Sequence, residues 1–296
     1  MDRVKKMVHY WCDDIKKKKL TGKGVTVAVL DTGLSVHPDF KGRVAGWRDC
    51  IYRKQYYYDD NGHGTHVAGI LAGSGWMSEG TLAGIAPGCR LVIVKVLDQK
   101  GEANVESILA GLRWVENNYR KYSIRIVNLS AGAGNHLEYR KEKMLIQAVE
   151  RLWNLGLVVV VSSGNSGPGE GTIAIPGNSR KVITVGAVKT GKIEKDSCSG
   201  RGPTKECVVK PDVVAPGYQI ISCNSRIHGK KDAYTVKSGS SMATPVVSGA
   251  VALLMEKYSK VTNVEVKLRL RETCVHLPGT GEQGWGMLNV QRFLEL

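Results

Sequence analysis

The sequence predicts an α/β fold, a three-layer sandwich in which a mainly parallel central sheet carries helices on both faces. Two observations lead to this prediction. Several apolar runs are continuous rather than alternating, as in strands covered on both faces: Val25–Leu30, Leu91–Leu97, Ile124–Leu129, Leu157–Val161 and Val182–Val188. Other segments have helical spacing: His63–Gly73, Val105–Tyr119, Lys141–Leu155 and Ser241–Tyr258. Strand–helix–strand alternation implies right-handed crossovers between parallel strands.

The expected elements follow one another in a regular order. The first strand reads VTVAVL, and the next four read LVIVKVL, IRIVNL, LVVVV and VITVGAV. Gly156 directly follows the helical segment Lys141–Leu155, as the C′ residue of a helix often does. The 35 glycines do not repeat every third residue, so they indicate tight turns and not a collagen-like chain. The chain has 296 residues and contains no internal repeat or linker, so one folded domain is expected.

The charge balance is strongly basic, with 42 cationic and 27 acidic residues and a formal net charge of +15. A basic arm is expected over residues 1–23, and the simplest interpretation is a solvated segment. Nucleic-acid binding is the alternative, but no recognition motif with interleaved aromatic residues supports it. The arm holds eight cationic residues: Arg3, Lys5, Lys6, Lys16, Lys17, Lys18, Lys19 and Lys23.

The cysteines indicate a reducing environment. There are seven of them, an odd number, and no pair has C-x-x-C spacing, so neither a disulfide framework nor a zinc ribbon is expected. The basic N-terminus is not followed by an apolar segment typical of a secretion signal, and no apolar stretch reaches the length of a membrane span. These features together favour a cytoplasmic protein without a membrane partner, and they leave the oligomeric state open.

Polar segments follow three of the expected strands. Asp31-Thr32-Gly33 follows the first, Ser130-Ala131-Gly132 the third, and Ser162-Ser163-Gly164-Asn165 the fourth. Ligand sites of open parallel sheets form outside the carboxyl ends of the strands. The three segments are therefore expected to meet in one crevice.

Two of the candidate catalytic residues have an ordinary structural interpretation when taken alone. Asp31 ends an apolar strand, where a buried carboxylate needs a partner, but it also suits a turn or a helix cap. Ser241 opens the apolar helix that follows Ser238-Gly239-Ser240, and a serine at a helix start is most often an N-cap.

The third fragment, Asn61–Gly69, contains two histidines. His63 lies at an expected helix start between two glycines, which permit close approach of the backbone, and His66 follows three residues later. The pair could be ordinary helix residues, or two metal ligands at positions i and i+3. The metal interpretation lacks an obvious third ligand.

Taken together, the three fragments resemble the signatures of the subtilisin family of serine proteases. The matching residues are Asp31-Thr32-Gly33, His63-Gly64-Thr65-His66 and Gly239-Ser240-Ser241-Met242-Ala243-Thr244-Pro245, in the order Asp, His, Ser that the family has. The similarity extends from about Gly22 to Asn289 and is strongest to the intracellular bacterial branch. Intermediate stretches agree as well: Gly84–Pro87, Ser199–Pro203 and Pro211–Gly217.

The resemblance implies a serine endopeptidase with a subtilisin-like peptidase domain over residues 24–296. Ser241 would be the nucleophile, His63 its general base, and Asp31 the residue that orients the imidazole. Asn165 would donate to the oxyanion together with the backbone N–H of Ser241. His66 is expected to pack or hydrogen-bond within its helix.

The same resemblance implies a cleft for an extended protein or peptide substrate. Ala174 would form the floor of one pocket, which suits apolar substrate side chains, and Glu102 would favour basic ones. The wall of a second pocket would comprise Leu97, Val105 and Ile108. The other substrate-binding candidates are Gly101, Ala103, Ser130, Ala131, Gly132, Ser163 and Gly164.

No cofactor is expected for the chemistry, and no metal ligand is assigned. Asp39 matches one calcium ligand position of the family, but the segment 73–80 does not resemble its ligand loop, so structural calcium is left open. The alternative to an active peptidase is a catalytically silent, subtilisin-like binding scaffold.

Overall fold

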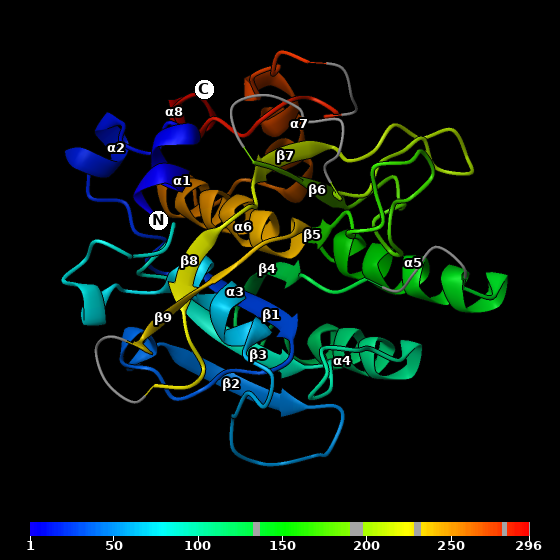
Figure 1. Ribbon diagram of the computed structural model, residues 1–296, viewed down its shortest axis with the longest axis horizontal. Helices are drawn as coiled ribbons and strands as arrows, with labels where there is room; N and C mark the ends of the chain where they lie inside the picture. Colours follow the sequence, from blue (N-terminus) through cyan, green and yellow to red (C-terminus); the bar gives the residue numbers. More distant parts are fainter. Residues whose placement is uncertain (133–136, 190–197, 228–231, 280–282, 296) are drawn as a thin grey trace.

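The computed structural model describes residues 1–132, 137–189, 198–227, 232–279 and 283–295 (Figure 1). Seven parallel strands form the central sheet in the order β2-β3-β1-β4-β5-β6-β7, which confirms the predicted fold class. The strands are β1 (Thr26–Asp31), β2 (Val44–Asp49), β3 (Arg90–Lys95), β4 (Ile124–Leu129), β5 (Val158–Ser162), β6 (Ile183–Val188) and β7 (Val213–Pro216).

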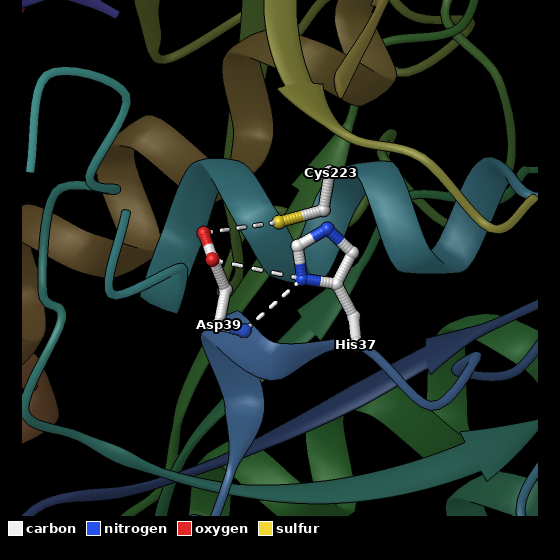
Figure 2. A group of neighbouring side chains, drawn as sticks. All are labelled: His37, Asp39 and Cys223. Carbon is white, nitrogen blue, oxygen red and sulfur yellow. Dashed lines mark hydrogen bonds and ion pairs between the residues drawn. The ribbon is translucent and has the colours of Figure 1, made fainter. Parts of the chain in front are cut away.

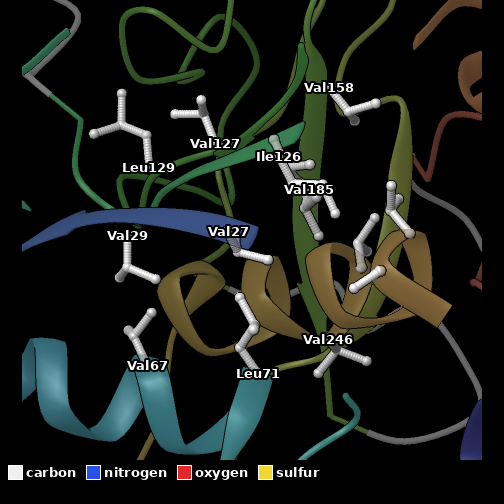
Figure 3. Close-up of a cluster of buried hydrophobic side chains, with 14 of the residues drawn as sticks. Val27, Val29, Val67, Leu71, Ile126, Val127, Leu129, Val158, Val185 and Val246 are labelled. Atoms are coloured by element: carbon white, nitrogen blue, oxygen red, sulfur yellow. The ribbon is translucent and has the colours of Figure 1, made fainter. Parts of the chain in front are cut away.

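Four longer helices cover the two faces of the sheet, as predicted. On one face, α3 (His63–Ala72) packs against α6 (Ser240–Lys257); α4 (Val105–Asn118) packs against α5 (Tyr139–Asn154) on the other. The alternation along β1 shows this division. Figure 3 shows Val27 and Val29 pointing toward α3, whereas Leu30 faces Gly111 of α4.

The remaining elements lie around this sandwich. An antiparallel pair, β8 (Ile220–Cys223) and β9 (Tyr234–Lys237), packs on α3. The short 3₁₀ helices are η1 (Pro38–Phe40) and η2 (Trp76–Ser78). The other helices are α1 (Asp2–Met7), α2 (Asp13–Lys16), α7 (Asn263–Thr273) and α8 (Val290–Glu295).

Helix α6 is the centre of the hydrophobic core. Every residue from Ser240 to Met255 is buried, because α6 lies between the sheet and the neighbouring helices (Figures 1 and 3). A helix enclosed on all sides is apolar all round, which explains its continuous small and apolar sequence. Truncating a core side chain such as Leu71 to alanine would cost about 2–5 kcal/mol. The start of α6, which carries Ser241, is therefore rigidly placed.

The expectation of a solvated N-terminal arm holds for its cations, since seven of the eight are exposed, but it is wrong for the segment as a whole, which packs on the core. Val4, Val8 and Tyr10 are buried and join the main hydrophobic core. The Val8 carbonyl oxygen accepts a 2.7 Å hydrogen bond from the backbone N–H of Val290, so α1 lies beside α8 (Figure 1). The cations of α1 alternate with apolar residues at helical spacing, and this amphipathic pattern outweighs the charge.

Two strands of the sheet were not expected from the sequence. β2 is an edge strand with mostly half-exposed residues, and β7 has only four residues, so neither forms a long apolar run. Within the described part of the chain, no helix has the length and apolar character needed to cross a bilayer.

Candidate active site

Asp31 and His63 form a close pair at the carboxyl edge of the sheet. Asp31 is fully buried at the end of β1, and its Oδ1 lies 2.7 Å from His63 Nδ1. Oδ1 also accepts a 2.7 Å hydrogen bond from the Thr32 backbone N–H. The second oxygen, Oδ2, is buried without a hydrogen-bond partner among the described residues. An incompletely paired buried carboxylate favours a positive charge on the neighbouring ring.

This pair changes the protonation of His63. Burial disfavours the charged imidazole, but the Coulomb attraction and the hydrogen bond of Asp31 outweigh it, so the pKa of His63 lies above its ordinary value. The ring is 24% exposed, so solvent and substrate can reach it. Because Asp31 faces Nδ1, Nε2 is the nitrogen available to a substrate or nucleophile.

The Asp59 carboxylate holds the start of α3, and so positions His63. It accepts hydrogen bonds from the Gly62 backbone N–H at 2.7 Å, and from the backbone N–H and hydroxyl of Thr65 at 2.9 and 2.6 Å. The Thr32 hydroxyl donates to Asp59 at 2.8 Å. The first backbone N–H groups of a helix have no partner within the helix, and Gly62 has no side chain to cap them. The Asp59 carboxylate accepts from them instead.

The glycines beside His63 are required by close contacts, as the sequence predicted. Gly62 has a φ of +96°, a left-handed conformation that L side chains rarely adopt. A Cβ on Gly64 would lie 2.3 Å from the carbonyl oxygen of Gly33. The loop after β1 can therefore touch the start of α3 only because residue 64 has no side chain.

Ser241 lies in the first turn of α6 and lines the same cleft as His63. Its hydroxyl donates a 2.9 Å hydrogen bond to the carbonyl oxygen of Ser130. In the described part of the structure it makes no hydrogen bond to the His63 ring. A hydrogen bond between Ser241 and the His63 ring would therefore require a rotation of the Ser241 side chain.

The orientation of the Asn165 side chain follows from its partners. The Ser240 backbone N–H lies 2.9 Å from Asn165 Oδ1, and the Ser240 hydroxyl lies 3.1 Å from it. A backbone N–H can only donate, so the amide oxygen must face Ser240, which leaves the Asn165 NH₂ group free for another acceptor. Gly239 allows this approach, because a Cβ there would lie 3.1 Å from Asn165 Nδ2.

A cleft of about 830 Å³ contains His63, Ser241 and Asn165. Of the nine predicted substrate-binding residues, eight line it: Gly101, Glu102, Ala103, Ser130, Ala131, Gly132, Gly164 and Ala174. Ser163 does not; its side chain is fully buried and contacts the Ser199 hydroxyl at 3.1 Å. Ser162 lines the cleft instead.

The backbones of Gly132 and Gly164 lie close to Ala174, the predicted pocket floor, and leave no space for side chains of their own. An added Cβ would lie 2.8 Å from the Ala174 Cβ if placed on Gly132, and 2.6 Å if placed on Gly164. Leu97 and Val105, predicted to form a second wall, line the same cleft, whereas Ile108 is fully buried in α4 and is absent from the lining.

Several residues around the site were not identified from the sequence. Asp59 precedes the histidine motif by four residues, and a capping aspartate could have been sought there. Lys95 is a charge inside an apolar strand, which signals a buried partner; its ammonium contacts Asp60 Oδ1 at 2.6 Å and the Thr32 carbonyl oxygen at 2.6 Å. Lys141 lines the cleft and lies 3.8 Å from Glu106.

His66 is a buried structural residue. Its Nε2 lies 3.0 Å from the carbonyl oxygen of Ile220 and 3.2 Å from that of Thr235, so it ties α3 to the β8–β9 pair. Burial, reinforced by the nearby His63, lowers the pKa of His66 to about 3. The ring is therefore neutral at physiological pH, in agreement with the packing role expected from the sequence.

The surroundings of Asp39 do not fit calcium. The backbone N–H groups of Gly75 and Met77 donate to its carboxylate at 2.9 and 3.2 Å, and the Tyr234 hydroxyl at 3.0 Å. Calcium requires six to eight oxygen ligands. These partners are donors aimed at the carboxylate, so they occupy its oxygens instead of adding ligands.

A serine at a helix start, an imidazole paired with a buried carboxylate and a nearby amide donor are the parts of a serine hydrolase. Comparison with known sequences identifies the family within this class of enzymes. Residues 22–286 match the subtilase family of S8 peptidases. The chain belongs to this family, whose members are serine endopeptidases.

Individual relatives agree with this assignment. The chain is 45% identical over 273 residues to the serine protease AprX of Bacillus subtilis (strain 168), covering 85% of this chain but only 61% of AprX. It is 37% identical to Subtilisin Savinase of Lederbergia lenta, covering 92% of this chain and 91% of that protein. The solved structure named Sphericase has a TM-score of 0.83 at 26% identity, covering 98% and 97% of the two chains.

Proposed function

We propose that this chain hydrolyses peptide bonds through an acyl-enzyme formed on Ser241, with His63 as general base and Asp31 orienting the imidazole. The observation that carries the proposal is the 2.7 Å contact between Asp31 and His63 in the cleft that Ser241 also lines. A serine hydroxyl is a weak nucleophile at neutral pH and needs such a base.

The proposed reaction begins with proton transfer from the Ser241 hydroxyl to His63 Nε2 as the oxygen attacks the scissile carbonyl carbon. The imidazolium that forms is stabilised by Asp31, and it then protonates the leaving amine. Water enters next, gives a proton to His63 and adds its oxygen to the acyl carbon. The bond between that carbon and the Ser241 oxygen then breaks, His63 returns the proton to Ser241, and the carboxylic acid product leaves.

The proposed oxyanion hole comprises the Asn165 NH₂ group and the Ser241 backbone N–H. The contact between Asn165 Oδ1 and Ser240 supports it, because that contact turns the NH₂ group away from Ser240. The first N–H groups of a helix have no intrahelical partner, so the Ser241 N–H is available to a developing negative charge.

The proposed substrate is a protein or peptide bound as an extended strand along the cleft. The small side chain of Ala174 between Gly132 and Gly164 leaves space for an apolar substrate side chain. Glu102 is proposed to favour basic substrate residues near its own position, whereas Glu106 is paired with Lys141 at 3.8 Å.

A cytoplasmic location is proposed from the thiols. All seven cysteines lie in described residues and are unpaired, including the exposed Cys207. Free thiols persist in reducing compartments. No nucleic-acid partner is proposed, since the basic N-terminal segment is used in packing: Arg3 donates to the Tyr218 and Gln219 carbonyl oxygens.

Covalent labelling with a fluorophosphonate tests the function. We expect the full-length protein to be labelled, the Ser241→Ala variant to be unlabelled, and mass spectrometry to locate the adduct on Ser241. A Ser240→Ala variant is the matched control, because it removes the neighbouring hydroxyl and should keep the label. Folded protein that resists labelling and cleaves no casein would instead indicate a silent binding scaffold.

A further inference from the structure

A buried cluster of His37, Asp39 and Cys223 lies outside the proposed catalytic site. One potential ligand atom from each residue lies within 4.8 Å of the other two. All three are buried, and they come from two distant segments: residues 37–39 at the start of η1, and the end of β8 (Figure 2). We propose that this cluster is a binding site for a zinc-like transition-metal ion.

The donor set and its spacing suit zinc. Imidazole nitrogen, carboxylate oxygen and thiolate sulfur are the usual protein ligands of Zn²⁺. Tetrahedral coordination with ordinary bond lengths places a sulfur and an oxygen ligand about 3.6 Å apart, and a nitrogen and an oxygen ligand about 3.4 Å apart. The observed separations are 3.6 Å between Cys223 Sγ and Asp39 Oδ2, and 3.7 Å between His37 Nδ1 and Asp39 Oδ1. Because these are different oxygens of one carboxylate, the ion would bind both of them or the Asp39 side chain would rotate.

The supporting hydrogen bonds of a metal site are already present. His37 Nε2 lies 2.9 Å from the Ala233 carbonyl oxygen, so Nε2 carries the proton and Nδ1 presents a lone pair to the cluster. A carbonyl that orients a ligating histidine in this way is typical of metal centres. At present the Nδ1 lone pair accepts a 3.1 Å hydrogen bond from the Asp39 backbone N–H, which the ion would replace.

The Asp39 carboxylate would exchange one of its present partners for the ion. Its two oxygens offer about four lone-pair positions. Gly75, Met77 and Tyr234 donors use three of these, and the Cys223 thiol uses the fourth. A metal ion would take the place of the thiol proton, which leaves to solvent. The thiolate and the carboxylate together would then neutralise the two positive charges of the ion.

A groove borders the cluster, although the side chains of His37 and Asp39 are themselves fully buried. His37 and Asp39 both line a groove of about 930 Å³ formed mainly by residues 35–44, separate from the catalytic cleft. A solvent molecule from this groove would supply the fourth ligand, since catalytic and open zinc sites commonly have three protein ligands. By linking η1 to β8, the ion would stabilise the region around α3.

Cobalt binding tests the site without any dependence on peptidase activity. The full chain carrying Ser241→Ala, which removes self-digestion, is freed of metal with a chelator and titrated with Co²⁺. We expect one equivalent to bind with a thiolate-to-cobalt charge-transfer band, and Zn²⁺ to displace it. Cys223→Ser should abolish the band, since a hydroxyl keeps the hydrogen bond to Asp39 but ligates poorly. The matched control is Cys89→Ser, another fully buried thiol, which should keep it.

Two results would contradict the proposal that His37, Asp39 and Cys223 bind a metal ion. One is the absence of stoichiometric Co²⁺ binding to the folded Ser241→Ala chain. The other is a charge-transfer band of equal strength in the Cys223→Ser protein, which would assign the metal to other thiols. If Cys223→Ser does not fold, X-ray absorption at the zinc edge of the Ser241→Ala chain decides. One sulfur ligand supports the proposal, and a spectrum without sulfur contradicts it.

Discussion

The Ser241 hydroxyl donates to the Ser130 carbonyl oxygen at 2.9 Å and not to His63. A neutral hydrogen bond of this kind contributes about 1 kcal/mol, so giving it up slows the reaction about fivefold. This is small beside the rate enhancements of serine proteases, which span many orders of magnitude. We therefore regard the observed rotamer as compatible with catalysis. In a crystal structure of the fluorophosphonate adduct, the Ser241 oxygen should no longer contact Ser130.

Replacing Asp31 by asparagine keeps the shape of the side chain but removes its negative charge, so the effect of the charge on kcat can be measured alone. We expect kcat to fall by about 10⁴-fold, the scale measured for this change in other triad proteases, because the neutral amide stabilises the wrong tautomer and no longer stabilises the imidazolium. Thermal melting should show that Asp31→Asn stays folded. A loss of less than tenfold would mean that the Asp31 carboxylate has no role in the reaction.

The pH profile provides an independent check of the same pair. In the proposed mechanism activity requires neutral His63, and Asp31 raises the pKa of this histidine. In the unaltered enzyme kcat/KM should therefore fall as the pH decreases through this raised pKa. In Asp31→Asn the attraction is absent, so the acid limb should move to lower pH. An unmoved or upward-shifted limb would show that another group titrates.

Asn165 allows two variants that isolate its donor group. Asn165→Asp keeps an oxygen facing Ser240 but loses the NH₂ group, whereas Asn165→Ala loses both contacts. Both should lower kcat by about 10²–10³-fold, the range known from subtilisin, with little change in KM. The matched control Asn104→Asp keeps the oxygen that caps α4 and adds the same charge elsewhere in the cleft, so kcat should fall far less than in Asn165→Asp. Comparable kcat in Asn165→Asp and the parent would exclude the oxyanion role.

Asp59 is expected to stabilise the fold as well as to position His63. Burial acts to raise its pKa, but hydrogen bonds from Thr65, Gly62 and Thr32 outweigh this and hold the pKa below its ordinary value. Asp59→Ala should lower the free energy of unfolding by more than about 3 kcal/mol, because several buried donors lose a charged acceptor. Asp13→Ala, at an exposed ion pair, should change it by less than about 1 kcal/mol in urea unfolding.

The sequence was sufficient to predict the sheet, and the crevice at its carboxyl edge, for a physical reason. Strands such as β4 and β5 are buried on both faces, so their apolar runs are continuous, and the residue that ends each run faces the same crevice. Asp31 could thus be placed near Ser130 and Asn165 before any coordinates were known.

Other features depend on tertiary contacts that no local pattern reveals. The burial of α1 depends on its contact with α8, and the 37–39 segment meets Cys223 across 184 residues of sequence. Ser162 and Ser163 are adjacent and chemically identical. Neighbouring side chains at the end of β5 point to opposite sides, and only this alternation decides that Ser162 faces the cleft.

His66 should make the protein sensitive to acid. Its pKa is about 3 in the folded protein, because burial excludes the charged ring, against about 6.5 in an unfolded chain. The unfolded chain therefore binds a proton that the folded protein does not, and stability falls as the pH decreases from about 6.5 toward about 3. The full effect is on the order of 5 kcal/mol.

The His66→Gln variant tests this in a Ser241→Ala background, with urea unfolding measured between pH 8 and pH 4. Glutamine keeps an N–H donor for the Ile220 carbonyl oxygen but does not titrate. We expect it to be less stable at pH 8 by about 1–3 kcal/mol, yet to lose less stability on acidification. His9→Gln, at an exposed histidine, should retain the parental pH dependence. If His66→Gln and the parent lose stability equally, a group other than His66 governs the acid response.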